Sequence, residues 1–119
     1  MPSDESAASL PQLAQISRAM MRVYKEKLGR GPDRAHSHYA GPDAIVCFLE
    51  GTLTPVERTL TTVDEHERLR DLRMVVQDVA RADLGAAIEQ ITGRVVIASS
   101  SGFDSRADVA CESFLLEPA

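Results

Sequence analysis

The chain has 119 residues, of which 44% are hydrophobic and 26% are charged. This length and balance are typical of one globular domain, and they exclude a collagen-like repeat, a disulfide-rich scaffold and a wholly disordered chain. With 13 Lys and Arg against 18 Asp and Glu, the formal charge is −5. We expect no nucleic-acid binding, because such binding depends on neutralising phosphates.

The N-terminal part of the chain predicts a short tail and then an amphipathic helix. Residues 1–8 are polar and acidic, and we expect them to be disordered, which leaves residues 9–119 as a single domain. Ser9 has the position of an N-cap. Apolar residues then recur at spacings of three and four, which predicts one buried helix face; they are Leu13, Ile16, Met20, Val23, Tyr24 and Leu28. Gly29 is expected to end this helix.

Two strands are expected next, at residues 34–40 and 44–50, joined by a Gly-Pro-Asp turn. The second run is apolar at consecutive positions, from residue 44 to 49. Such a run is typical of a central strand buried on both sides, or of a strand at an interface.

The strongest local signal is a capping box at Thr54 and Glu57, with Pro55 at the first helical position. It predicts a short helix. A second capping pattern, which begins at Asp64, opens a longer helix that Gly93 ends. The apolar stripe predicted for this helix is Leu69, Leu72, Val76, Val79, Ala87, Ile88 and Ile91.

The last two strands are expected at residues 94–100 and 107–117, with a polar loop at residues 101–106 between them. The order is therefore α-ββ-αα-ββ. It predicts a two-layer α+β fold, a four-stranded antiparallel sheet with two long helices on one face. The other face would expose the apolar side chains of Val46, Phe48 and Phe114. A bare apolar face on a small domain indicates a partner, and we expect a homodimer.

One loop has the composition of an anion site. Gly29, Arg30 and Gly31, with Arg34 close behind, would present backbone N–H groups and guanidinium groups to phosphate, carboxylate or bicarbonate. The same glycines also suit a helix end followed by a turn. A small-anion sensor is therefore one alternative function.

A metal site has less support. His36 and His38 share one side of a strand, but two imidazoles need further ligands. Cys47 and Cys111 fall in strand-like stretches and are expected to be buried, reduced thiols. A metal-binding protein or an enzyme is a second alternative. We expect neither a metal nor a cofactor, and no enzymatic activity, because local spacing assembles no nucleophile, base or pair of acids.

The sequence also predicts a cytoplasmic protein that does not insert into a membrane. Its longest uninterrupted apolar run has six residues, from 44 to 49, whereas a membrane-spanning helix needs about 20. The first residues lack the basic and apolar regions of a signal peptide.

Four stretches of the chain resemble the MpsC family, named for a component of a Na+-translocating, membrane-potential-generating system. The most specific is Leu-Glu-Gly-Thr-Leu-Thr-Pro-Val-Glu at residues 49–57. The others are residues 24–25 with 29–32, residues 92–96 and residues 114–117. Together they extend from about residue 12 to 117. One departure is the loop at residues 101–108, where the family pattern leads us to expect an Asp-rich turn.

The resemblance implies a cytoplasmic accessory of a membrane ion- or inorganic-carbon-transport system, peripheral to the membrane through a partner. It implies no reaction, cofactor or catalytic residue. The first hypothesis is therefore a non-catalytic interaction module. Its candidate interface and motif residues are Val46, Phe48, Leu53, Thr54, Pro55, Glu57 and Phe114.

Overall fold

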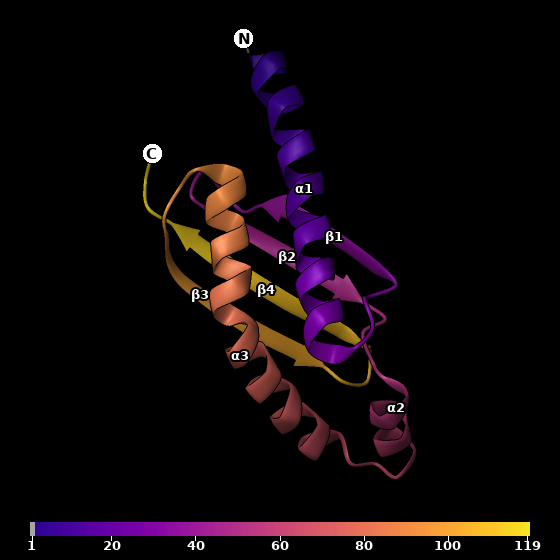
Figure 1. Cartoon of the computed structure of the whole chain (residues 1–119). Helices are drawn as coiled ribbons and strands as arrows, with labels where there is room; N and C mark the ends of the chain where they lie inside the picture. The colour runs from indigo at the N-terminus through magenta and orange to yellow at the C-terminus, as the bar shows by residue number, and fades with distance from the viewer. Residues whose placement is uncertain (1) are drawn as a thin grey trace.

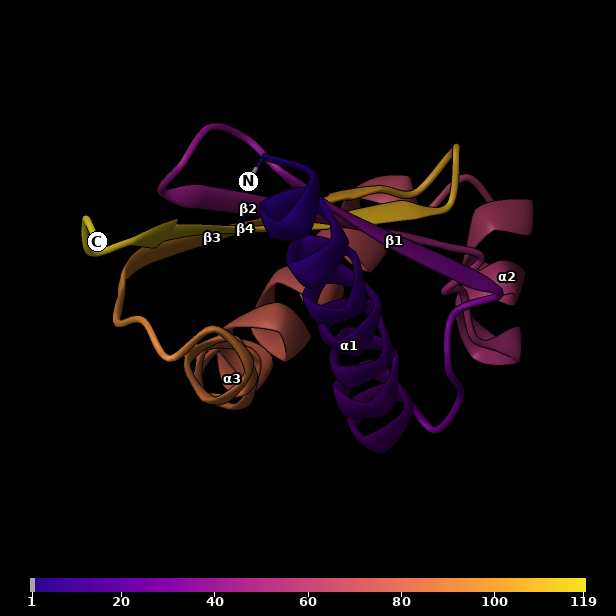
Figure 2. The ribbon, with the colours of Figure 1, turned by 90° about the horizontal axis from the view of Figure 1, so that it is seen from above.

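The computed structural model describes residues 2–119, with side chains from residue 11 onward. The elements follow in the predicted order (Figure 1): α1 (Pro2–Leu28), β1 (Arg34–Tyr39), β2 (Ala44–Glu50), α2 (Pro55–Thr62), α3 (His66–Thr92), β3 (Val96–Asp104) and β4 (Val109–Leu116). The strands form one antiparallel sheet in the order β1-β2-β4-β3. Seen from above, α1 and α3 lie on the same side of this sheet (Figure 2). The predicted α+β architecture is confirmed.

The second predicted strand matches β2 at both ends and has the central position that its composition indicated. Its side chains alternate, since Ile45, Cys47 and Leu49 are at most 1% exposed and face the helices. The residues between them are half-buried and face the other way.

The hydrophobic core lies between the two long helices and the inner face of the sheet. The stripe predicted for α1 contributes to it as expected, with Ile16, Met20, Val23 and Tyr24 buried and Leu13 and Leu28 packed at its margin. From the other elements the core takes Ile45, Cys47, Leu49, Ala80, Leu84, Ala87, Ile88, Ala110, Phe114 and Leu116.

Two predicted boundaries are wrong by several residues, and the ends of the last two strands differ by smaller amounts. Helix α1 begins at Pro2 rather than at Ser9; the side chain of Ser9 and all of Met1 lie outside the described residues, and the disorder of residues 1–8 stays a prediction. The predicted loop at 101–106 belongs largely to β3. The chain turns only after Asp104, whose carboxylate accepts hydrogen bonds from the backbone N–H groups of Arg106 and Ala107, each at 3.0 Å.

The predicted start and stripe of α3 also need correction. The N-cap is Glu65, not Asp64, and its side chain makes no capping hydrogen bond. Leu72 and Val79, predicted to be buried, are 49% and 63% exposed. The buried face instead consists of Leu69, Arg73, Gln77, Ala80, Leu84, Ala87 and Ile88. Apolar periodicity missed this face because two of its members are polar.

Candidate protein-interaction surfaces

The second face of the sheet is the first candidate surface. Within residues 2–119, no helix covers it (Figure 2). Its central strands carry apolar side chains that alternate with the buried ones, namely Val46, Phe48, Val109, Cys111 and Leu115. We call these five residues the open sheet face. A shallow groove bordered by β2, β3 and β4 runs along it.

The sequence placed two of its three candidates correctly on this face. Val46 and Phe48 lie there, but Phe114 is 3% exposed and belongs to the core. The outward position is held by Leu115, which is 46% exposed. The prediction for Phe114 is wrong because β4 turns Glu112 inward, and Phe114, two residues on, must share that side.

Glu112 faces inward because other buried polar groups meet it there. Its carboxylate accepts hydrogen bonds from the hydroxyls of Tyr24, at 2.5 Å, and of Ser101. The amide nitrogen of Gln77, on α3, donates to the same carboxylate at 3.3 Å and to the carbonyl of Gly102 at 3.0 Å. The network joins α1, α3, β3 and β4 at one buried point.

Burial raises the pKa of Glu112 above its ordinary value, although hydrogen bonds from Ser101, Tyr24 and Gln77 and the charge of Arg81 oppose this. The pKa of Tyr24 is raised too, first by burial and then by the adjacent Glu112. Because Glu112 is only 2% exposed, we assign the cluster a structural role, the joining of two helices to the sheet.

The family-like stretch at residues 49–57 forms a second buried network. The predicted capping box is present, since the Thr54 backbone N–H donates to Glu57 at 2.9 Å and the Thr54 hydroxyl accepts from the Glu57 N–H at 3.3 Å. Pro55 stands at the start of α2. The two oxygens of the Glu57 carboxylate also accept one hydrogen bond each from Arg73, at 2.6 and 2.8 Å.

Arg73 is fully buried, and each nitrogen of its guanidinium group donates a hydrogen bond. Besides Glu57, its guanidinium donates to the hydroxyl and the carbonyl of Thr52, at 2.9 and 2.7 Å. It lies 4.5 Å from the centre of the Phe103 ring. Burial acts to raise the pKa of Glu57, but hydrogen bonds from Arg73 and Thr54 and the charge of Arg73 outweigh it and lower that pKa below its ordinary value.

The same stretch is tied to the turn between β3 and β4. The Asp108 carboxylate accepts from the backbone N–H groups of Thr52, at 2.8 Å, and Leu53, at 3.1 Å. Leu53 is itself 5% exposed. Four predicted interface residues, Leu53, Thr54, Pro55 and Glu57, thus build the α2 region; of these only Pro55 is exposed.

The candidate anion loop is built from Gly29 to Arg34. Gly29 ends α1 in the left-handed region, with φ of 83°, and Gly31 follows it. The Arg30 guanidinium donates to the Leu53 carbonyl at 2.9 Å and to the Asp33 carboxylate at 2.7 Å. Arg34 lies 3.7 Å from Glu50. The Arg30 guanidinium therefore already has two acceptors within the chain, whereas Arg34 makes only an exposed ion pair.

His36 and His38 do meet on the outer side of β1, with Nδ1 of His36 2.8 Å from Nε2 of His38. The other nitrogen of His36 lies 3.0 Å from Glu50. Among the described residues, no group of three or more His, Cys, Asp or Glu side chains is placed to hold a metal ion. Cys47 is buried on the inner face of the sheet, whereas Cys111 is half-buried on the open sheet face; both are free thiols.

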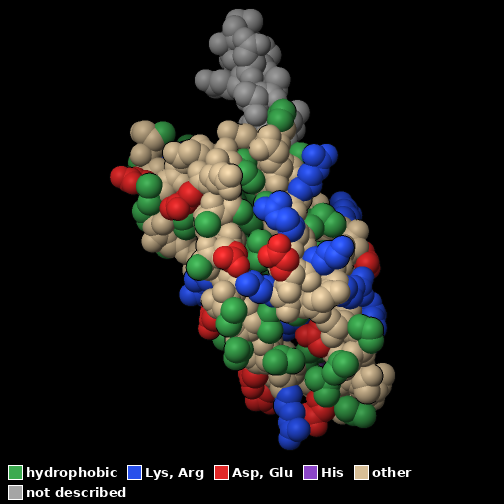
Figure 3. Space-filling view, in the orientation of Figure 1, with side chains coloured by type: hydrophobic (Ala, Val, Ile, Leu, Met, Phe, Trp, Pro, Cys, Tyr) green, Lys and Arg blue, Asp and Glu red, His purple; other side chains and the backbone are tan. Residues whose placement is uncertain are grey.

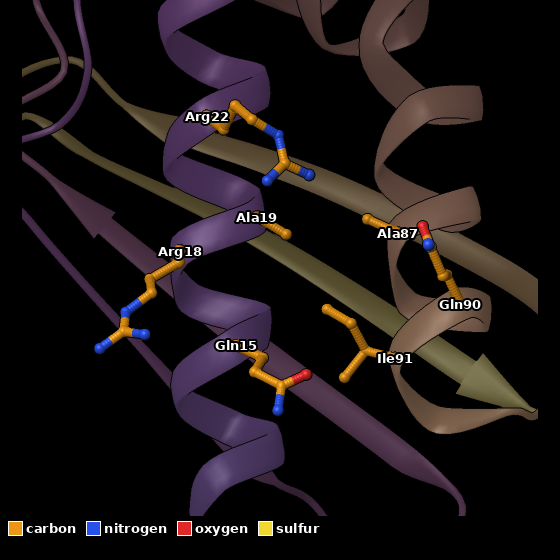
Figure 4. A pocket seen from close by; sticks show the side chains of 7 residues that line it. All are labelled: Gln15, Arg18, Ala19, Arg22, Ala87, Gln90 and Ile91. Carbon is orange, nitrogen blue, oxygen red and sulfur yellow. The ribbon is translucent and has the colours of Figure 1, made fainter.

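A polar groove separates α1 from the C-terminal part of α3 (Figure 4). Arg22 points across it towards α3, whereas Arg18 points away (Figure 4). Its floor is made by the small side chains of Ala19 and Ala87, which let the two helices approach. It brings together no acid, base or nucleophile arranged for catalysis.

The second candidate surface was missed by the sequence analysis. On the outer side of α3, Leu72, Val75 and Val79 are 49%, 61% and 63% exposed. Exposed Ala82 and Ala86 continue the line. We call these five residues the α3 ridge. Figure 3 shows hydrophobic side chains exposed on the lower part of the molecule, where α2 and the beginning of α3 lie. Apolar periodicity assigns Leu72 and Val79 to the buried face and leaves the other three residues without a role.

No helix in the described part of the chain combines the length and hydropathy required to cross a membrane. No curated protein and no solved structure shows a significant match to the sequence. The sequence profile described as "Na+-translocating membrane potential-generating system (MpsC)" matches residues 12–118. That range contains both buried networks and both candidate surfaces, and on this match the chain belongs to the MpsC family.

Proposed function

We propose that the chain is a non-catalytic accessory module of a Na+-translocating, membrane-potential-generating system, located in the cytoplasm and held at the membrane by a protein partner. The description of the MpsC family supports the assignment to a Na+-translocating system. The main support for a non-catalytic interaction role is the distribution of polar and apolar side chains between the interior and the surface. Arg73, Glu57 and Glu112, which could do chemistry if accessible, are at most 4% exposed, while apolar side chains are displayed on two surfaces.

Purification of the tagged chain from its own host tests the membrane role. Soluble and gently solubilised membrane fractions are analysed separately by mass spectrometry. Stoichiometric recovery of a membrane transporter from the membrane fraction is the expected result. Recovery of the chain alone, from the soluble fraction, would contradict it.

We further propose that two copies associate through the open sheet face. Val46, Phe48 and Leu115 present an apolar strip on adjacent central strands, and burying such a strip is favourable by about 25 cal/mol per Å². A facing copy would cover all three residues. The helix side of the sheet offers no comparable strip, because α1 and α3 already cover it.

Cys111 gives a direct probe of this association. It lies on the open sheet face, whereas Cys47 is in the core. Labelling of Cys111 by a thiol reagent should slow as the protein concentration rises, and Leu115→Glu should remove that dependence. Val56→Glu, at a 73% exposed position on α2, is the matched control. A labelling rate independent of concentration in the unaltered chain would refute the dimer.

The small-anion sensor remains a hypothesis with less support. Its central side chain, Arg30, already donates to Asp33 and to the Leu53 carbonyl. An anion would have to displace the Asp33 carboxylate before it could bind the same guanidinium edge.

A further inference from the structure

We propose that the α3 ridge is the docking site for one amphipathic helix of another protein, whose apolar stripe is flanked by basic residues. The ridge lies on the side of α3 turned away from the core, so no rearrangement is needed to reach it. Its three large members are 49% to 63% exposed. Single exposed apolar side chains are normal on a protein surface, but a contiguous apolar stripe such as this one marks an interaction site.

The spacing of the ridge selects a helix as the occupant. Leu72, Val75, Val79, Ala82 and Ala86 follow one another at intervals of three, four, three and four residues. This is the a and d pattern of a heptad repeat, whose side chains insert between those of a second helix. A sheet or an irregular segment would not match this spacing over the four turns that the ridge occupies.

The flanks of the ridge select the charge of that helix. At the positions that border a heptad seam, α3 carries Asp71 and Asp78 on one side and Asp83 on the other. Asp78 and Asp83 have basic neighbours, Arg81 at 2.9 Å and Lys27 at 3.0 Å, but these pairs are exposed and therefore weak. A partner with Lys or Arg along both sides of its stripe would complement this border.

The same charges argue against a second copy of this chain. In a parallel pair of α3 helices, Asp78 of one copy would face Asp83 of the other. In an antiparallel pair, the register that sets Leu72 against Ala82 would bring Asp78 of one copy against Asp78 of the other. Like charges at these positions disfavour pairing. The side chains of the ridge also become smaller from Leu72 to Ala86. The partner therefore needs its larger side chains opposite the alanines.

Two peptides of about 21 residues, three heptads each, test the proposal. Both carry Leu at every a and d position; one has Lys and the other Glu at every e and g position. Binding to the full chain is measured by fluorescence anisotropy at physiological salt. The Lys peptide should bind and the Glu peptide should not. Val79→Glu should weaken binding by about tenfold or more, because it places a charge in the seam.

Charge reversal separates recognition from general attraction to an acidic protein. The double variant Asp71→Lys, Asp78→Lys should bind the Glu peptide and lose the Lys peptide. Leu115→Glu, on the open sheet face, is the control and should leave peptide binding unchanged. Binding of the Lys peptide that Val79→Glu does not weaken, or binding of neither peptide, would overturn the proposal.

This inference rests on the proposed role as an interaction module, but the experiments distinguish a failure of the α3 docking site from a failure of the sheet-face dimer. If Val79→Glu dissolves a dimer that Leu115→Glu leaves intact, the ridge pairs two copies of this chain and the proposed partner is wrong. If the Lys peptide binds while the chain is monomeric, the docking site stands and the sheet-face dimer fails.

Discussion

The two halves of α3 differ in the polarity of their buried faces and in the size of the apolar side chains that they expose. The C-terminal half packs Leu84, Ala87 and Ile88 against the sheet and exposes charged residues and small alanines, as a surface helix normally does. The N-terminal half lies towards the end of the sheet, beside α2 (Figure 1). There the buried face includes Arg73 and Gln77 as well as Leu69, and the apolar side chains of the α3 ridge point to solvent.

This difference separates what holds the fold together from what is left for partners. The buried polar side chains of the first half have partners in named loops and strands, so they fix the helix in one position. The outward aliphatic side chains have no such partners among the described residues, and removing them should cost the fold little. We therefore expect inner substitutions to affect stability and outer substitutions to affect association.

The largest effect on stability is expected from Arg73→Met. The substitution leaves the Glu57 carboxylate, 5% exposed at its side chain, without its cation. Breaking a buried pair in this way costs about 3 to 5 kcal/mol of unfolding free energy. Urea titration measures it, with Arg70→Met at an exposed position of the same helix as the control. Adding Glu57→Leu to Arg73→Met should recover part of the loss. A loss no greater than that of Arg70→Met would contradict the account.

A smaller, pH-dependent effect is expected from Glu112→Gln. Because burial raises the folded-state pKa of Glu112, the folded chain holds this proton more tightly than the unfolded chain. The stabilisation is therefore complete below the unfolded pKa, about 4.3, and is lost as the pH rises through the folded pKa. Glu112→Gln stays neutral and should escape this loss. Unfolding free energies from pH 4 to 8 should diverge between the two proteins; parallel curves would show that Glu112 is not the group responsible.

The smallest effect on stability is expected from Arg30→Ala. This substitution removes a guanidinium near the surface, whereas that of Arg73 is buried. It loses an exposed bond to Asp33 and a half-buried bond to Leu53, together worth about 1 kcal/mol. Melting temperatures with and without phosphate, formate or bicarbonate test the anion hypothesis at the same time. Because the guanidinium is occupied, we expect no shift with millimolar anions. A clear rise in the original chain that Arg30→Ala abolishes would restore the sensor hypothesis.

Local patterns predicted the elements well, but not which polar residues turn inward. The capping box at Thr54 and the apolar run of β2 depend on neighbouring residues, so the sequence contains enough to place them. The inward orientation of Glu112 depends on Tyr24 and Gln77, which are 88 and 35 residues away along the chain. The periodicity of a strand does not contain that information. Because the inward side of β4 could not be identified from it, Phe114 was assigned to the wrong face. The α3 ridge has the same cause, because apolar periodicity assigns Leu72 and Val79 to a buried face that Arg73 and Gln77 occupy instead.

Sedimentation equilibrium of the unaltered chain, Leu115→Glu and Val79→Glu over a range of concentrations tests the central claim most directly. The account predicts that the unaltered chain and Val79→Glu both approach twice the 12.9 kDa mass of one chain. It predicts that Leu115→Glu stays at the mass of a single chain. An unaltered chain that remains at 12.9 kDa at every concentration, or a dimer indifferent to Leu115→Glu, would contradict it.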